Sequence, residues 1–228
     1  MRRIRDAFRR CSMLRDGQWL AWFLVCFPLG SFIILTSEVS EALTGERELI
    51  GIIDHHVLAF IAEHRTPFLT GIAIDLTALG SVAGLSILTL FLCAFLFFSK
   101  ERLLALHALL AGIGAAGLTT ALKFHFERSR PEDSFRLVEV QGFSYPSGHS
   151  LASAAIYFTC AILVHKRLSD LPSRCIMWTF FLALIGAIGF TRIYLGAHFF
   201  SDVIAGIMIG IAWASLLEIG MSRLGRAS

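Results

Sequence analysis

Charge is scarce in this 228-residue chain. Lys, Arg, Asp and Glu together make up only 16% of it, whereas hydrophobic residues make up 56%, including 20 Phe. A soluble domain of ordinary composition carries about a quarter charged residues. The composition therefore argues against a typical soluble fold and indicates a membrane protein.

The basic surface that nucleic-acid binding requires is also absent. The net charge is only +3, from 20 basic and 17 acidic side chains, and the basic residues are gathered in short stretches. No groove or helix face collects them. We therefore expect no nucleic-acid partner.

The sequence shows no sign of cysteine pairing, of a cleavable leader or of internal repeats. The five cysteines show no framework of paired spacings. The basic start and the following apolar run lack a small-x-small cleavage pattern, which predicts an uncleaved anchor behind a basic cytoplasmic segment, 1–17. With no sign of a second domain, we expect one membrane-embedded domain over 1–228.

What the chain does contain is six apolar stretches close to the length of a bilayer crossing, about 20 residues. They occupy 18–36, 72–98, 103–123, 149–165, 175–193 and 199–219. Backbone groups in hydrocarbon must be satisfied within the segment, and the alternation of a membrane β-barrel is absent. The sequence predicts an all-α, integral-membrane bundle of six transmembrane helices.

A seventh helix is predicted between the first two spans. In the segment 37–71, Leu49, Ile53, Val57 and Ile61 recur at helical intervals. This periodicity predicts an amphipathic helix lying on the outer interface of the membrane.

Basic residues at the span ends predict the orientation. They precede span one, separate spans two and three, separate spans four and five, and follow span six. With six spans these four groups share one side, which should be cytoplasmic. We expect a multi-pass protein of the cytoplasmic (inner) membrane with both termini in the cytoplasm. The other side also carries cations, against the usual bias, chiefly Lys123, Arg128, Arg130, Arg136 and Arg192.

Three separate segments place polar groups at the outward ends of the spans. They are "KFHFERSRP" with Lys123 and Arg130, "PSGH" from Pro146 to His149, and "TRIYLGAHFFSD" with Arg192, His198 and Asp202. Each alone has an ordinary explanation, such as a snorkelling cation or a helix start. Together they indicate a single site.

The residue types in this site favour phosphate chemistry. His198 and Asp202 are four residues apart on one helix face, where a carboxylate can hold the imidazole in one tautomer. Clustered Lys and Arg repel one another unless an anion joins them, and guanidinium matches phosphate oxygens. The N-terminus of span four, at Gly148, adds free backbone N–H groups and the positive end of the helix dipole.

The three segments follow a pattern: Lys, six residues, Arg-Pro; then Pro-Ser-Gly-His; then Arg, five residues, His, three residues, Asp. This pattern resembles that of the type 2 phosphatidic acid phosphatase family. That family shares its core with vanadium-dependent haloperoxidases. The resemblance covers 123–202, and one position departs from the pattern, since Thr191 stands where the third motif usually has Ser.

The resemblance implies a role for each motif residue. His198 would be the nucleophile that forms a phosphohistidine, oriented by Asp202. His149 would protonate the leaving group and then activate water. The phosphoryl oxygens would be held by Lys123, Arg130, Ser147, Gly148 and Arg192. Since fixed cations supply the electrostatics, we expect neither a metal nor another cofactor.

The expected activity is therefore hydrolysis of a lipid phosphate monoester or pyrophosphate at the outer face, with membrane lipids as surroundings. The motifs leave the head group open among phosphatidate, phosphatidylglycerophosphate, undecaprenyl pyrophosphate and the phosphates of lipid A. A vanadate-dependent haloperoxidase and a non-enzymatic transporter are the alternatives, disfavoured by the six spans and by the clustering at one interface. Selectivity is expected from 37–71, 132–145 and the gaps between spans.

The remaining histidines allow a further alternative. Asp54, His55, His56, Glu63 and His64 could ligate a metal, although adjacent residues on a helix diverge by about 100°. His107 is expected to be buried, and His125 to lie at the edge of the phosphate pocket.

Overall fold

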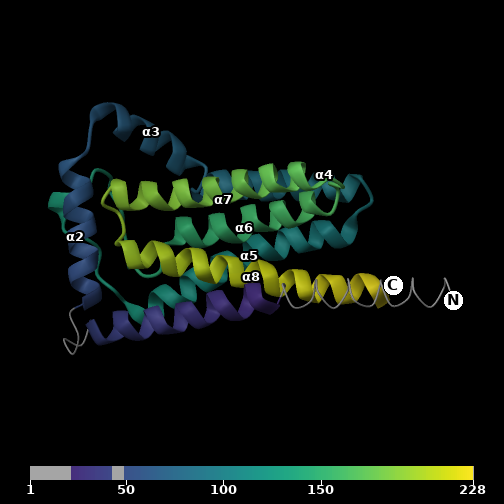
Figure 1. Cartoon of the computed structure of the whole chain (residues 1–228), viewed down its shortest axis with the longest axis horizontal. Helices are drawn as coiled ribbons and strands as arrows, with labels where there is room; N and C mark the ends of the chain where they lie inside the picture. The colour runs from purple at the N-terminus through teal and green to yellow at the C-terminus, as the bar shows by residue number, and fades with distance from the viewer. Residues whose placement is uncertain (1–21, 43–48, 228) are drawn as a thin grey trace.

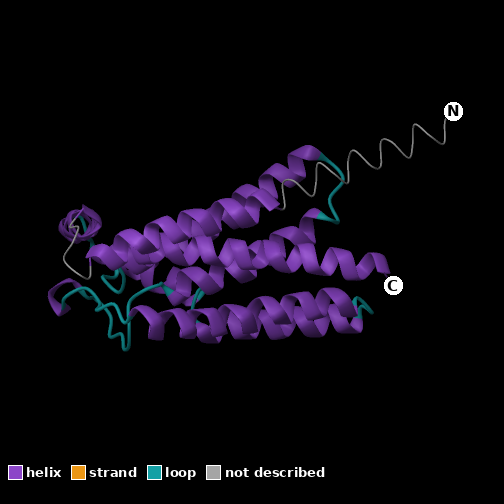
Figure 2. Ribbon diagram, turned by 90° about the horizontal axis from the view of Figure 1, so that it is seen from below, coloured by secondary structure: helices purple, strands orange, loops and turns teal. Residues whose placement is uncertain are grey.

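The computed structural model describes residues 22–42 and 49–227, and all regular structure in these ranges is helical (Figure 1, Figure 2). The helices are Trp22–Ala42, α2 (Leu49–Glu63), α3 (Pro67–Ala78), α4 (Val82–Phe98), α5 (Arg102–Phe126), a short 3-10 turn η1 (Asp133–Phe135), α6 (Gly148–His165), α7 (Leu171–Tyr194) and α8 (Phe200–Ala227). The predicted all-α class is confirmed. The basic segment 1–17 lies outside the described residues.

Membrane-crossing segments match the predicted spans with one difference. Within the described residues, five helices are long and apolar enough to cross a membrane, and α3 with α4 supplies a sixth segment that is bent by 42°. The prediction of one continuous helix over 72–98 was wrong. The chain breaks at Leu79-Gly80-Ser81, because the Ser81 hydroxyl accepts the Gly84 N–H and thereby caps a new helix.

The centre of the bundle is α6, which packs against α5, α7 and α8. Its contact with α8 depends on glycine, because residues without a side chain let two helix backbones approach closely. A Cβ at Gly206 would lie 2.7 Å from the Ser147 carbonyl oxygen, and one at Gly210 would lie 2.5 Å from that of Leu151. Any larger residue would force the two backbones apart.

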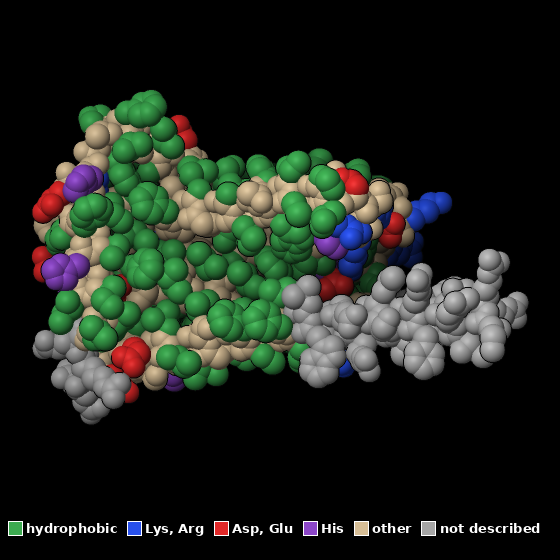
Figure 3. All heavy atoms as spheres, viewed as in Figure 1, with side chains coloured by type: hydrophobic (Ala, Val, Ile, Leu, Met, Phe, Trp, Pro, Cys, Tyr) green, Lys and Arg blue, Asp and Glu red, His purple; other side chains and the backbone are tan. Residues whose placement is uncertain are grey.

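Hydrophobic side chains cover the flank of the bundle in Figure 3, while Lys and Arg gather at one end. Val82 and Phe98 are each 82% exposed, and Ile176 is 71% exposed. Such a surface would be costly in water and suits contact with lipid tails.

The helix α2 lies across the opposite end of the bundle (Figure 1). The structure confirms a helix there, but its buried face differs from the predicted stripe. Leu49 and Ile53 are exposed, whereas Asp54 and Leu58 are fully buried. Leu58 packs with Ile193, Phe199 and Val203 of the α7–α8 region, and an acidic residue therefore faces the bundle.

Candidate active site

The three predicted motifs meet at the end of the bundle where α2 lies. Lys123 is in the last turn of α5, His149 in the first turn of α6, and Arg192 in the last turn of α7. His198 precedes α8. A cavity of about 700 Å³ is lined by six of the eight predicted site residues: Lys123, Arg130, Gly148, His149, Arg192 and His198.

The two nitrogens of His198 face different partners. Nε2 lies 3.3 Å from an Arg130 nitrogen, whereas Nδ1 lies 3.3 Å from the Ser144 hydroxyl and 3.5 Å from Asp202 Oδ2. Asp202 is fully buried behind the imidazole and does not line the cavity. The arrangement directs the Nδ1 proton toward the carboxylate and leaves Nε2 toward the cations of the cavity.

Burial lowers the pKa of His198 to about 4, because a charged imidazole would lose its hydration there. Asp202 opposes this shift, while Arg130 and Arg192 add to it. The imidazole is therefore neutral at pH 7, which is the form in which Nε2 has a free lone pair.

A network that sequence reasoning missed holds Asp202. Its Oδ1 accepts a hydrogen bond from Arg128 at 2.6 Å, and its Oδ2 accepts from the Ser144 hydroxyl at 2.5 Å and from the Phe199 N–H at 2.9 Å. Arg128 also pairs with Asp54 of α2 at 2.7 Å. The sequence signals for this network are weak, because Arg128 is one of several cations on the side predicted to face outward and Asp54 is one of several candidate metal ligands.

The three predicted cations are held by polar partners around the cavity. Arg130 donates to the carbonyls of Ala197, Gly142 and Gln141 at 2.8–2.9 Å. Lys123 donates to the Phe143 carbonyl. These bonds fix the two side chains near the N-terminus of α6.

Arg192 reaches the cavity from the other side. One of its terminal nitrogens donates to the Thr77 hydroxyl at 2.9 Å, at the end of α3. Its Nε is buried without a hydrogen-bond partner, so the guanidinium retains donor capacity. Thr191, the departure from the family pattern, donates its hydroxyl to the Ile188 carbonyl of its own helix.

Ser147 and Gly148 begin α6 differently. Ser147 is fully buried and does not line the cavity; its hydroxyl oxygen caps the helix by accepting from the Ser150 N–H and hydroxyl. Gly148 lines the cavity, and a Cβ there would lie 3.0 Å from the Thr119 methyl group. The glycine thus keeps the helix N-terminus open to a ligand.

From these polar groups the cavity continues into an apolar gap between α4 and α5. Its lining there includes Leu85, Thr89, Leu90, Leu109, Gly112, Ile113 and Ala116. Val140 and Gln141 represent the predicted selectivity segment 132–145, whereas no described residue of 37–71 lines the cavity. The gap between spans is therefore the larger part of the lining.

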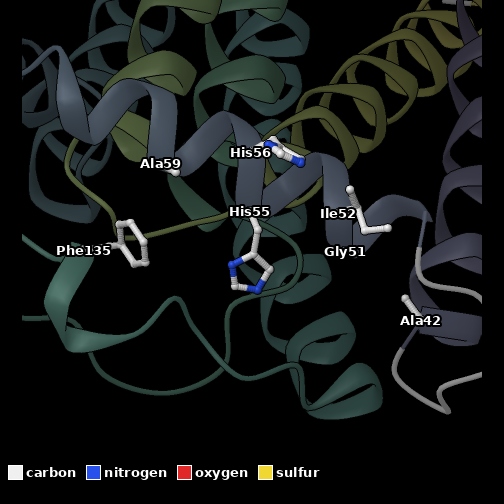
Figure 4. A pocket seen from close by; sticks show the side chains of 7 residues that line it. All are labelled: Ala42, Gly51, Ile52, His55, His56, Ala59 and Phe135. Carbon is white, nitrogen blue, oxygen red and sulfur yellow. The ribbon is translucent and has the colours of Figure 1, made fainter.

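The other histidines lie outside this cavity. His107 is fully buried, as expected, but His125 is exposed and is not a lining residue. A separate hollow of about 540 Å³ beside α2 is lined by His55 and His56, which project in different directions (Figure 4). Within 22–42 and 49–227, no three His, Cys, Asp or Glu side chains gather closely enough to hold a metal.

Comparison with known proteins identifies the family. The model of the PAP2 superfamily matches residues 103–225, which includes all eight predicted site residues. The chain belongs to the PAP2 superfamily. The resemblance seen in the three motifs is thereby confirmed.

Individual known proteins resemble the chain over different lengths. Phosphatidylglycerophosphatase B of Bacillus subtilis is 34% identical over 148 residues, which are 64% of this chain and 72% of that protein. The glucose-6-phosphatase catalytic subunit 1 of Rattus norvegicus is 38% identical over 77 residues, 30% of this chain and 22% of that protein.

The fold is shared with a solved structure. The crystal structure of a transmembrane PAP2-type phosphatidylglycerolphosphate phosphatase from Bacillus subtilis superposes with a TM-score of 0.79 at 26% identity, over 89% of this chain and 98% of that one. The expected class, a membrane-spanning lipid phosphatase, is confirmed by these relatives.

Proposed function

We propose that the enzyme releases phosphate from a glycerophospholipid phosphate monoester, with phosphatidylglycerophosphate as the first candidate, at the outward face of the membrane. The observation that carries this proposal is the shape of the cavity, which joins His198 and His149 to an apolar gap between α4 and α5. A phosphate head group fits the polar end and an acyl chain fits the gap. The names of the Bacillus subtilis relatives support this choice of head group.

In the proposed first step, His198 Nε2 attacks phosphorus while Asp202 and Ser144 hold the Nδ1 proton. An N–P bond forms, the ester P–O bond breaks, and His149 gives its proton to the departing lipid oxygen. Lys123, Arg130 and Arg192 neutralise the phosphoryl oxygens, and the N–H groups at Gly148 supply further donors.

In the second step His149, now neutral, takes a proton from water as the water oxygen attacks phosphorus. The N–P bond breaks, phosphate leaves, and both histidines return to their starting forms. The fully buried Ser147 supports Gly148 through the helix cap and is not assigned to a phosphate oxygen. No metal or other cofactor takes part in either step.

The test is phosphate release from a panel of substrates with and without chelator. The panel contains phosphatidylglycerophosphate, phosphatidate, undecaprenyl pyrophosphate, lipid A and glucose 6-phosphate. We expect the first to be turned over fastest, chelator to have no effect, and H198A and H149A to lose at least about a thousandfold in kcat. Release by H198A at the parental rate would refute the mechanism, and preference for glucose 6-phosphate would refute the lipid substrate.

A further inference from the structure

Arg128 joins two carboxylates that come from distant parts of the chain. One terminal nitrogen bonds Asp202 Oδ1 at 2.6 Å, and the other bonds Asp54 Oδ2 at 2.7 Å. The two Asp side chains are 0% exposed and that of Arg128 is 8% exposed. Burial opposes the charge of Arg128, but Asp202 and Asp54 outweigh it and raise its pKa. The two carboxylates therefore favour the charged form of Arg128 despite its burial.

Further contacts fix this trio against the start of α8. The Ser201 hydroxyl accepts from Arg128 at 2.7 Å, and the hydroxyl and N–H of Ser201 both donate to Asp54. The guanidinium carbon lies 4.5 Å from the centre of the Phe199 ring, and the N–H of Phe199 donates to Asp202. Asp54 thus ties α2 to the segment that carries His198.

We propose that Asp54 and Arg128 are positioning residues for the reaction, which act on His198 through Asp202. The inference rests on the proposed role of His198 as the nucleophile. With Oδ1 of Asp202 held by Arg128, Oδ2 is directed at Ser144 and at the Nδ1 side of His198. The carboxylate cannot rotate away without breaking a buried ion pair.

Charge adds to the geometric effect. One guanidinium and two carboxylates leave the trio with one net negative charge beside His198. This charge favours the Nδ1 proton and the positive charge that the imidazole acquires when Nε2 bonds phosphorus. Without Asp54, Arg128 would cancel the charge of Asp202 and weaken that stabilisation.

The first experiment compares Asp54→Asn with Glu63→Gln, a matched loss of an exposed carboxylate on the same helix. Phosphate release from the preferred lipid is measured in detergent micelles. We expect kcat of D54N to fall about 10- to 100-fold, as when other residues that orient a reacting group are changed. KM and the inhibition constant of inorganic phosphate should stay within about twofold, and E63Q should match the parent.

The second experiment uses Arg128→Lys, which keeps the charge but has one nitrogen in place of the two that bridge the carboxylates. We expect kcat to fall as far as in Arg128→Gln. Asp54→Glu, which restores the charge, should recover part of the activity lost in D54N. Melting temperature and gel-filtration profile show whether each variant is folded. If D54N does not fold, the activities of R128K and D54E test the positioning role in its place.

Parental kcat in folded D54N or R128K would overturn the inference. It would also be overturned if a variant lost the same fraction of its phosphate-binding sites as of its activity, because the loss would then reflect missing sites and not a slower reaction. Failure of the proposed function is seen separately, in H198A. If H198A is inactive while folded D54N is fully active, the phosphohistidine mechanism survives and only the positioning role is lost.

Discussion

His198 is the residue whose surroundings matter most for the proposed phosphoryl transfer. Its side chain is almost wholly buried, yet one nitrogen faces cations and the other faces a carboxylate. Burial and the nearby Arg130 and Arg192 keep it neutral, and Asp202 keeps the proton on the side away from the substrate. A nucleophile is thus prepared without a general base of its own.

This environment predicts the acid side of the pH profile. Because the pKa of His198 is lowered to about 4, Nε2 remains unprotonated down to that pH, and kcat/KM should fall only as the pH drops through about 4. A histidine with an ordinary pKa would lose activity already below about 6.5.

The measurement is kcat/KM from pH 3.5 to 8 with two substrates whose phosphate groups have different pKa values. The part of the profile that is the same for both belongs to the enzyme. An enzyme limb centred near 6.5 would contradict the predicted environment of His198.

At the scale of elements, the break between α3 and α4 shapes the site. Thr77, in the last turn of α3, bonds Arg192, while Gly80, Leu85 and Thr89 line the cavity. A single straight helix over 72–98 could not place both ends of this segment against the site. The bend thus links the phosphate-binding region with the gap between α4 and α5.

The gap gives a prediction about chain length. Ala116 and Ala121 are both exposed alanines of α5, but only Ala116 lines the cavity. Ala116→Phe should fill the gap and reduce kcat/KM for a long-chain lipid phosphate about tenfold or more, because the phenyl ring takes the space in which the acyl chain would be buried. A short-chain analogue should be affected by less than about twofold.

Ala121→Phe is the control for this prediction, since it adds the same side chain to the same helix outside the cavity. It should leave both substrates unaffected. Equal losses for long-chain and short-chain substrates in Ala116→Phe would show that the gap does not hold the acyl chain.

For the whole molecule, the cations at the site end no longer contradict the positive-inside bias. Arg128 pairs with two carboxylates, Arg136 pairs with Asp133 at 2.7 Å, and Lys123, Arg130 and Arg192 line the cavity. Since these five cations, like Arg65 over the Tyr194 ring, have a role in structure or binding, the basic connections at the other end of the bundle determine the orientation. We therefore propose that the site faces outward and both termini face the cytoplasm.

Cysteine labelling of intact cells tests this orientation. In a background without the five native cysteines, Glu132→Cys lies at the site end and Ser99→Cys at the opposite end, both exposed. A thiol reagent that cannot cross membranes should label Glu132→Cys in intact cells and Ser99→Cys only after the cells are opened. The reverse pattern would invert the proposed topology.

Much of this protein could be predicted from its sequence because the signals are local. A long apolar run must form a helix in a membrane, whichever helices surround it. The residues of the three motifs also lie in short stretches of sequence, although His198 meets Asp202 from the turn before α8 and not from a shared helix face. Hence the helical class, most of the spans and the residues of the three motifs all follow from local patterns of residues.

Tertiary structure decided what depends on contacts between distant residues. Asp54 and Arg128 are separated by 74 residues, and so are Arg128 and Asp202, so no local pattern indicates that one guanidinium bridges both carboxylates. The same holds for Ser144 beside His198 and for the cavity between α4 and α5. Sequence alone determined which groups can react with phosphate, whereas packing determined which of them are neutral, buried and directed at one another.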